Sequence, residues 1–379
     1  MRMEEKLSEK FDLDKISADI GCWLDSVSNN LESGRFKYCL EKSLVPSTGK
    51  MGLVSTCFAL KIAWQCGIWE TWGYDKKKAC IEFIKSFQNQ KGYFVDPWLA
   101  DSCKIGLKEK LLSVFPNKSI KEYKRKHEYN FTANVNAETR QACSVLLMLG
   151  SQPRYKLPTQ ITNVRDAEKF ISNLNRNDPW HLCSQISHQI MILSVNKEIF
   201  SDNNNYKLIM KFFETLLKKN FSEEFGSWFI ENETENQMKI NAAMKIYSGL
   251  AWIDYRIKNK KLIDLILNNP IVFDGCSFNN SLFALYHARI GIEKYREREI
   301  HAKAFQSLNH SLNHKKPSSG FSFHLRESKR QYYTQFTSKG NNQADLHGTT
   351  MFVLGITLAL RLLGDNAPVG HERWKLYKG

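Results

Sequence analysis

Several patterns are missing from this 379-residue sequence, and each absence excludes a class of protein. Period-two alternation of apolar and polar residues over more than four positions is nearly absent, which argues against a sheet protein. The N-terminal stretch is charged throughout and lacks the apolar core of a signal peptide. The longest apolar run, 349–364, is interrupted by Arg361 and is short for a membrane span, so we expect a core helix there and no transmembrane segment.

A disulfide framework is also missing. The nine cysteines are odd in number, irregularly spaced and without a CxxC pair. Secreted disulfide-rich domains have even, regularly spaced cysteines, so the pattern excludes that class. Most of these cysteines lie within apolar helical patterns, where a free thiol packs as a small hydrophobic side chain. We therefore expect a cytoplasmic protein.

The formal net charge is +15, from 54 Lys and Arg against 39 Asp and Glu. Nevertheless the chain contains no zinc-finger, helix-turn-helix or RNP signature, and its lysines are mostly mixed with acids, so nucleic acid is not the favoured partner. The excess charge predicts attraction to anions such as diphosphates, anionic glycans or a membrane surface.

Helical periodicity recurs from end to end and predicts an all-α fold of about a dozen helices. In chain order, the predicted helices include 56–67, 76–89, 137–150, 166–175, 184–194, 205–219, 238–254, 260–267, 279–292, 295–308 and 347–363. No Pro/Gly/Ser-rich linker divides the chain, so we expect one domain over residues 1–379. The segment near 100–130 is charged and reads as an insertion.

Three loops share a glycine followed by aromatic residues: 89–99, 222–232 and 316–326. Each follows one predicted helix and precedes another, which indicates a helix pair of about 45–60 residues repeated about six times. The irregular spacing and the strongly apolar second helices favour hairpins closed into a ring over an open solenoid. We therefore predict an α/α toroid of about six helical hairpins with a cavity at one mouth.

Two short motifs in the last third add a resemblance. "FDGCSF" places Asp274 and Cys276 at a helix start, and "ADLHGTT" places His347 at the start of the last helix. Together with the Gly-aromatic loops, they resemble squalene and oxidosqualene cyclases and the β subunits of protein prenyltransferases. The resemblance implies a zinc site in which Asp274, Cys276 and His347 are the ligands and an open position binds an acceptor thiol. It also implies a partner subunit.

The diphosphate grip of that family has no counterpart beside Asp274. The preceding run "ILNNPIV" contains no cation, so the positive charges are expected elsewhere, at Arg140, Lys245 or Arg326. The chain contains neither a D-x-D-D run for protonating an alkene nor a D-D-x-x-D run for metal-triggered ionisation. Asp345 either orients the ring of His347 or caps the last helix.

Each candidate residue also has a purely structural reading. Asp274 would cap a helix and Cys276 would belong to the core. Glu138 and Arg140 open an apolar helix, either as an ordinary amphipathic start or as an acid/base group and an anion clamp facing the cavity. The predicted substrate-binding residues are Lys245, Tyr247, His188, Trp180 and Arg326. An unpaired lysine is costly to bury, so Lys245 is either an edge residue or a cavity cation.

We expect an enzyme that resembles the prenyltransferases or terpenoid cyclases and acts on an isoprenoid diphosphate, with zinc as the implied cofactor. Its partner would be a hydrophobic or anionic small molecule. One alternative is a toroid lyase, epimerase or hydrolase acting on an anionic sugar, with a long groove lined by Trp and Arg. Another is a non-catalytic scaffold whose ring centre is filled.

Overall fold

The computed structural model describes residues 11–30, 33–45, 52–98, 118–270, 274–333 and 335–378. Most of these residues are helical, which confirms the predicted all-α class. Much of the expected charged insertion, residues 99–117, lies outside the described residues. Its continuation from Lys118 opens a 31-residue helix, α8 (Lys118–Met148), that runs into the apolar segment predicted at 137–150.

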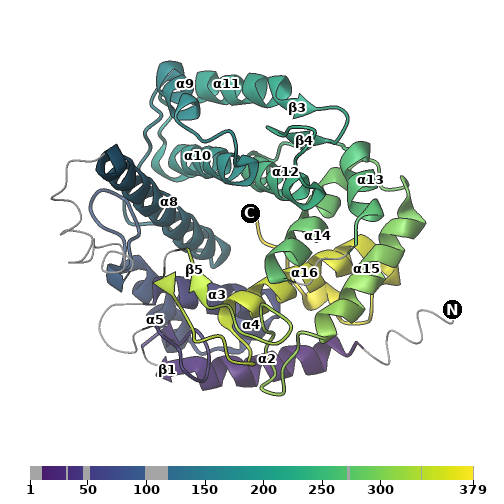
Figure 1. The fold of residues 1–379 in the computed structure, drawn as a ribbon. Coiled ribbons are helices and arrows are strands. Elements are labelled where there is room, and N and C mark those ends of the chain that lie inside the picture. The colour runs from purple at the N-terminus through teal and green to yellow at the C-terminus, as the bar shows by residue number, and fades with distance from the viewer. Residues whose placement is uncertain are drawn as a thin grey trace.

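A closed succession of helices surrounds the centre of the molecule (Figure 1). Each of these inner helices contacts the next, and the last contacts the first. In chain order they are α3 (Leu53–Gln65), α8, α10 (Pro179–Phe200), α12 (Asn236–Leu250), α14 (Gly275–Arg289) and α16 (Leu346–Leu363). Their close packing explains why α10 is buried on every side from Leu182 to Asn196.

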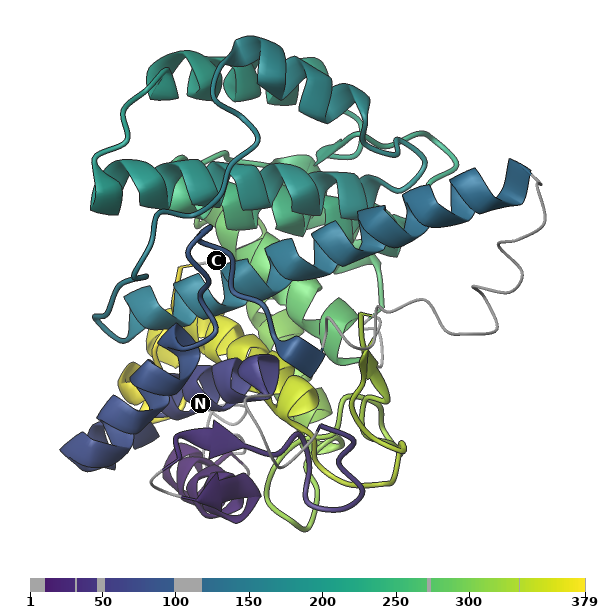
Figure 2. The ribbon, with the colours of Figure 1, turned by 90° about the vertical axis from the view of Figure 1, so that its left-hand side faces the viewer.

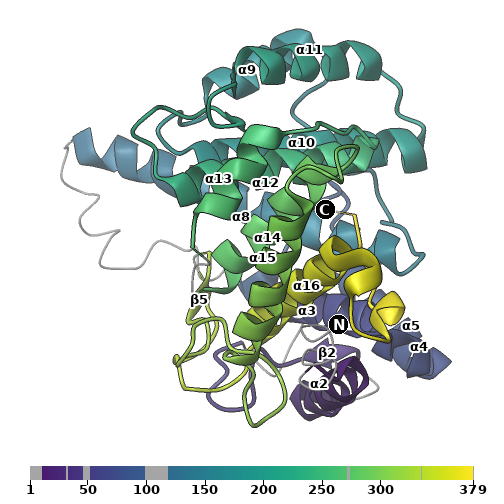
Figure 3. The same cartoon turned by 90° about the vertical axis from the view of Figure 1, so that its right-hand side faces the viewer.

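A second set of helices lies outside the first, and each of its members precedes an inner helix in the chain (Figures 1 and 3). These outer helices are α2 (Leu13–Val27), α5 (Tyr74–Lys85), α9 (Val164–Ser172), α11 (Tyr206–Lys219), α13 (Lys260–Asn268) and α15 (Glu297–Leu312). Short helical turns complete the pattern: α4 (Ile68–Thr71), η1 (Ala251–Ile253), η2 (Gly364–Asn366) and η3 (His371–Arg373). The predicted helices agree with the observed ones to within a few residues at most ends.

The Gly-aromatic loops form short antiparallel pairings that bury one ring each. Phe94 bridges Gln88, Trp228 bridges Phe221, and Phe321 bridges Lys315. All three bridging rings are buried. A glycine lies one or two residues before each ring, and where it has positive φ, as at Gly226 (φ +65°), it turns the chain at low cost.

The small sheets of the described chain are two-stranded and antiparallel. They pair β1 (Ser28–Asn30) with β2 (Arg35–Phe36), β3 (Phe221–Ser222) with β4 (Ser227–Trp228), and β5 (Gln331–Tyr332) with β6 (Gln335–Phe336). The first repeats the Gly-aromatic arrangement, since Gly34 has φ +64° and Phe36 is buried. The sequence reading did not identify this fourth copy.

One helical stretch among the described residues, Leu346–Asn366, is long and apolar enough to cross a membrane by composition. Within the protein, 83% of its most apolar window is buried. It contacts α3, α14 and α15. The expected core helix is therefore confirmed.

Candidate functional site

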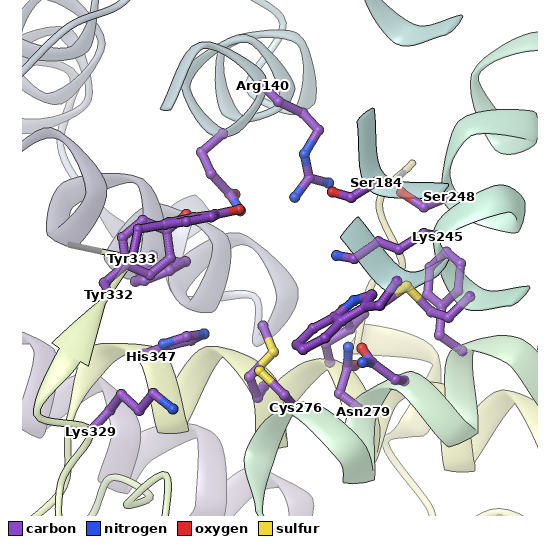
Figure 4. A pocket seen from close by; sticks show the side chains of 18 of the residues that line it. Arg140, Ser184, Lys245, Ser248, Cys276, Asn279, Lys329, Tyr332, Tyr333 and His347 are labelled. Carbon is purple, nitrogen blue, oxygen red and sulfur yellow. The ribbon is translucent and has the colours of Figure 1, made fainter. Parts of the chain in front are cut away.

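The inner helices enclose a cavity of about 400 Å³ (Figure 4). Side chains from all of α3, α8, α10, α12, α14 and α16 reach it, together with residues around β5 and one from the C-terminal segment. Its volume lies within the range of small-molecule sites. The residues that line it include Phe58, Lys61, Arg140, Gln141, Asp178, Trp180, His181, Met244, Lys245, Cys276, Phe283, Lys329, Tyr332, Tyr333, His347, Met351, Leu354 and Tyr377.

Four cationic side chains line this cavity and come from four separate parts of the chain. Lys61 lies on α3, Arg140 on α8, Lys245 on α12 and Lys329 in the loop before β5. Among the described lining residues the one carboxylate is Asp178, which caps α10 by accepting a hydrogen bond from the backbone N–H of His181. Positive charge therefore dominates the cavity.

The described contacts of these cations are with neutral groups. Lys61 Nζ donates a 2.6 Å hydrogen bond to Gln141 Oε1 and lies 4.6 Å from the ring centroid of Tyr377. Lys245 Nζ lies 6.0 Å from the ring of Trp180. Arg140 Nε is buried, and no described residue forms a hydrogen bond with it. Aromatic faces attract cations, but more weakly than a carboxylate would in the same place.

Burial and mutual repulsion lower the affinity of two of these lysines for their protons. The pKa of Lys61 falls to about 7, first because of burial and then because of Arg140. The pKa of Lys245 falls to about 7 for the same two reasons, in the same order. A bound anion would reverse both effects, because it favours the charged form of each lysine.

The C-terminal segment forms one wall of the cavity. Lys375 N donates to Gln65 O at 2.9 Å, which holds the segment against the end of α3. Trp374 is buried, and its carbonyl accepts a hydrogen bond from Arg361. Tyr377 consequently lines the cavity, and Figure 1 places the C-terminus at the centre of the ring of helices.

The three predicted zinc ligands are divided between the cavity and a helix cap. Asp274 Oδ1 accepts 3.0 Å hydrogen bonds from the N–H groups of Cys276 and Ser277, so its carboxylate caps α14. Cys276 and His347 both line the cavity. Within the described ranges, no three His, Cys, Asp or Glu side chains are grouped closely enough to hold a metal ion.

Burial keeps Cys276 and His347 in their neutral forms. The pKa of the Cys276 thiol is raised to about 11, mainly by burial and then by Asp274. The pKa of His347 is lowered to about 3, mainly by burial and then by Lys329. The His347 ring stacks on Phe58 with centroids 5.0 Å apart, and its Nδ1 is buried without a hydrogen bond.

Asp345 performs the capping role that was one of its two expected readings. Its carboxylate accepts hydrogen bonds from Gly348 N at 2.7 Å, from Phe323 N at 2.9 Å and from Lys329 N at 3.1 Å. The buried carboxylate therefore ties the start of α16 to the loop that carries Lys329 into the cavity. Among the described residues, no hydrogen bond joins Asp345 to the ring of His347.

Of the predicted site residues, Arg140, Lys245 and Trp180 line the cavity. Glu138 does not line it: the carboxylate is buried and accepts a 2.9 Å hydrogen bond from Asp96 N. Burial raises the pKa of Glu138 well above its usual range. Its contacts are those of a structural residue.

Three further predicted residues also lie away from the cavity lining. Tyr247 is buried, and its hydroxyl donates to Ile257 O at 3.0 Å. His188 is buried with no hydrogen bond at either ring nitrogen, and burial lowers its pKa well below the usual range. Arg326 is exposed. Of the two predicted residues on α12, Lys245 lies at the cavity and Tyr247 lies away from its lining.

The sequence reading missed Lys61, Lys329, Tyr332, Tyr333 and Tyr377. Lys61 carried a usable signal, because it interrupts an otherwise apolar helix as Lys245 does. The other four belong to the segment around β5 and to the C-terminal segment, whose position over the cavity depends on tertiary contacts.

Comparison of the chain with protein-family models, with curated proteins and with solved structures found no match. The assignment of a function therefore depends on the geometry and charge of the cavity.

Proposed function

We propose that the central cavity binds an isoprenoid diphosphate and that the protein is an enzyme of the prenyltransferase or terpenoid cyclase type. One observation carries the proposal: Lys61, Arg140, Lys245 and Lys329 converge on a cavity whose described lining includes a single carboxylate. A diphosphate carries the opposite charge and many acceptor oxygens. It would provide the anionic partners that these cations lack within the described residues.

The remainder of the lining suits a hydrocarbon chain. Phe58, Met244, Phe283, Met351 and Leu354 provide apolar surface in the same cavity. A ligand with a charged head and an apolar chain would contact both parts of the lining. A small ligand with charge alone would leave this apolar surface in contact with water, which is unfavourable.

The aromatic rings suggest how the cavity would assist the reaction. When an allylic diphosphate ionises, the leaving group gains negative charge and the carbon chain gains positive charge. The cations would stabilise the leaving diphosphate. Trp180, Tyr332 and Tyr333 also line the cavity, and the faces of such rings attract a carbocation.

Zinc binding by Asp274, Cys276 and His347 stays part of the proposal as a separate hypothesis. Their oxygen, sulfur and nitrogen donors suit zinc, which would lower the pKa of an acceptor thiol. The carboxylate of Asp274 uses one oxygen for its two cap bonds. No step described above depends on the metal.

The closed order of helix contacts supports the toroid part of the proposal. In such a ring the inner helices carry the cavity and the outer helices cover them, which is the arrangement that the family resemblance implies. Cytoplasmic location and a partner subunit belong to the same proposal. The free cysteines of the described chain are compatible with a reducing compartment.

Isothermal titration with geranyl diphosphate, farnesyl diphosphate and inorganic pyrophosphate tests the proposal. We expect binding by the wild type and a loss of about ten- to a hundred-fold in affinity for Lys245→Ala and Arg140→Ala, because each removes a charged hydrogen-bond donor. Lys261→Ala, on the exposed side of α13, is the control. Measuring whether the protein releases diphosphate from geranyl or farnesyl diphosphate then tests catalysis.

The proposal is overturned if the wild type binds none of the three compounds, or if Lys245→Ala and Arg140→Ala bind them as the wild type does. The cavity would then favour the second candidate, an enzyme acting on an anionic sugar. The observation behind that candidate is that Tyr332, His347 and Arg140 share one cavity, with the Tyr332 and His347 rings 5.5 Å apart. Digestion of acidic oligosaccharides, followed by the absorbance of unsaturated products, distinguishes the two.

A further inference from the structure

A second cavity lies on the opposite side of the α10–α12 helix pair from the central one. It is enclosed by α11, by α10, by the β3–β4 hairpin and by the residues around η1, and its volume is about 590 Å³. Figures 1 and 2 show α11 as the outer helix above α10. No residue lines both cavities in the described chain.

The walls of this second cavity are mainly apolar. Its floor is formed by Ile190 and Trp228, and one side by Met210, Phe213 and Leu217 of α11. Native interiors contain few voids larger than a water molecule. Water held against apolar walls of this extent is released favourably when an apolar ligand enters.

The cavity is also long. The α11 residues that line it run from Tyr206 to Lys218, which corresponds to about 18 Å along the helix axis at 1.5 Å per residue. An elongated apolar slot of this length selects an extended hydrocarbon chain over a compact ring system. We call it the α11 slot.

Charge at the rim of the α11 slot is unevenly compensated. Glu214 pairs with both Lys211 and Lys218, at 3.0 and 2.7 Å. Lys207, exposed at the N-terminal end of α11, and Glu223, beyond the C-terminal end of that helix, have no ion pair among the described residues. The helix dipole adds positive potential at the N-terminal end. An acidic group would therefore be favoured beside Lys207.

We propose that the α11 slot binds a single-chain lipid with an acidic head group, of which a long-chain fatty acid is the simplest case. The carboxylate lies beside Lys207, and the hydrocarbon chain runs along α11 toward Phe221 and Trp228. This site does not depend on the function proposed for the central cavity.

Titration of the full-length protein with palmitate tests the proposal. Met210→Trp fills the slot, and we expect it to lower the affinity for palmitate at least about ten-fold. Leu208→Trp is the matched control, because Leu208 is on the same helix, 62% exposed and outside the slot. The affinity of this variant for palmitate should stay within about two-fold of wild type. Lys207→Glu should weaken binding, whereas Lys219→Glu, exposed on the same helix, should not.

Two other occupants give different results. If palmitate occupies the central cavity, Lys245→Ala abolishes its binding while Met210→Trp leaves it intact, and the proposal is overturned. If a second copy of the chain covers the slot, the wild type is a dimer by light scattering and Met210→Trp is a monomer, which also overturns it. Absence of palmitate binding to the wild type overturns it directly.

Discussion

Lys61 of α3 and Gln141 of α8 are joined in the wall of the central cavity by a 2.6 Å hydrogen bond, and a neutral amide thus stands where a buried lysine commonly has a carboxylate. The lysine is 3% exposed. Its pKa of about 7, and that of Lys245, place both charges near their titration point at physiological pH. The cavity can therefore take up protons when an anion enters it.

Anion affinity should fall as the pH rises through 7. Below that value Lys61 and Lys245 are protonated and attract an anion, and above it they lose their charges. Sulfate is a suitable probe because its own charge does not change between pH 6 and 9. We expect its affinity to fall at least several-fold over this interval, measured by isothermal titration.

The double variant Lys61→Met/Lys245→Met is the comparison for that experiment. It should bind sulfate weakly and with a much flatter pH profile. Wild-type affinity that is constant from pH 6 to pH 9 would contradict the assignment of these lysines to the anion site.

Lys61→Met should stabilise the protein at pH 6. The pKa of Lys61 is lowered in the folded state, so the unfolded chain binds more protons between about pH 7 and 10 and the stability of the wild type rises over that window. Below pH 7 the wild type has a buried cation, and replacing it with methionine should raise the free energy of unfolding by about 1–3 kcal/mol.

Urea denaturation at pH 6 and at pH 8.5 measures this difference. The gain should shrink at the higher pH, where the wild-type lysine is largely neutral. Lys261→Met, on an exposed position of α13, should change stability by less than about 0.5 kcal/mol at either pH. A destabilised Lys61→Met protein at pH 6 would show that the hydrogen bond to Gln141 outweighs the cost of burial.

Elemental analysis of the purified, untagged protein tests the zinc hypothesis. The family resemblance predicts about one zinc per chain, lost in both Cys276→Ala and His347→Ala. Circular dichroism of the two variants shows whether they remain folded. A wild-type protein without metal would leave Asp274 as the cap of α14 and Cys276 as a thiol of the cavity wall.

Gly92→Ala should be far more damaging than Gly67→Ala. Both glycines have positive φ, +87° and +73°. A Cβ atom at Gly92 would lie 1.9 Å from the carbonyl oxygen of Lys156. A Cβ atom at Gly67 would have no heavy atom of the described residues within 4 Å, apart from those of its two chain neighbours. We expect a loss of about 3 kcal/mol or more at Gly92 and about 1 kcal/mol at Gly67. If thermal or urea denaturation gave equal losses of stability for the two variants, the Gly-aromatic loop would be able to accommodate the added Cβ atom by a small shift of its backbone.

Local patterns predicted the helices well because an inner helix is apolar on all sides and an outer helix along one stripe. The ranges 205–219 and 260–267 match α11 and α13 closely. The same patterns located Arg140 and Lys245, because a cation on an otherwise buried helix has few places to go except a cavity. Lys61 carried the identical signal and was overlooked.

The remaining cavity residues could not be found in this way. Tyr332 and Lys329 reach the cavity because Asp345 anchors their loop, and Tyr377 does so because the chain returns to Gln65. These contacts join segments far apart in sequence, and no local period encodes them. The sequence also could not distinguish the two interpretations of Asp274, as a metal ligand or as a helix cap. They differ only in what the second oxygen of its carboxylate contacts.

The contact between α16 and α3 also sets the order in which the molecule can be completed. Leu346 N donates to Tyr38 O, and the hydroxyl of Thr350 lies 3.5 Å from the carbonyl of Phe58, 292 residues away. The chain must be synthesised through α16 before this contact can form. Before that point the apolar face of the first hairpin is uncovered. Closing so long a loop costs conformational entropy, which slows this step of folding. Until α16 is in place, the central cavity lacks the wall that His347, Met351 and Leu354 form.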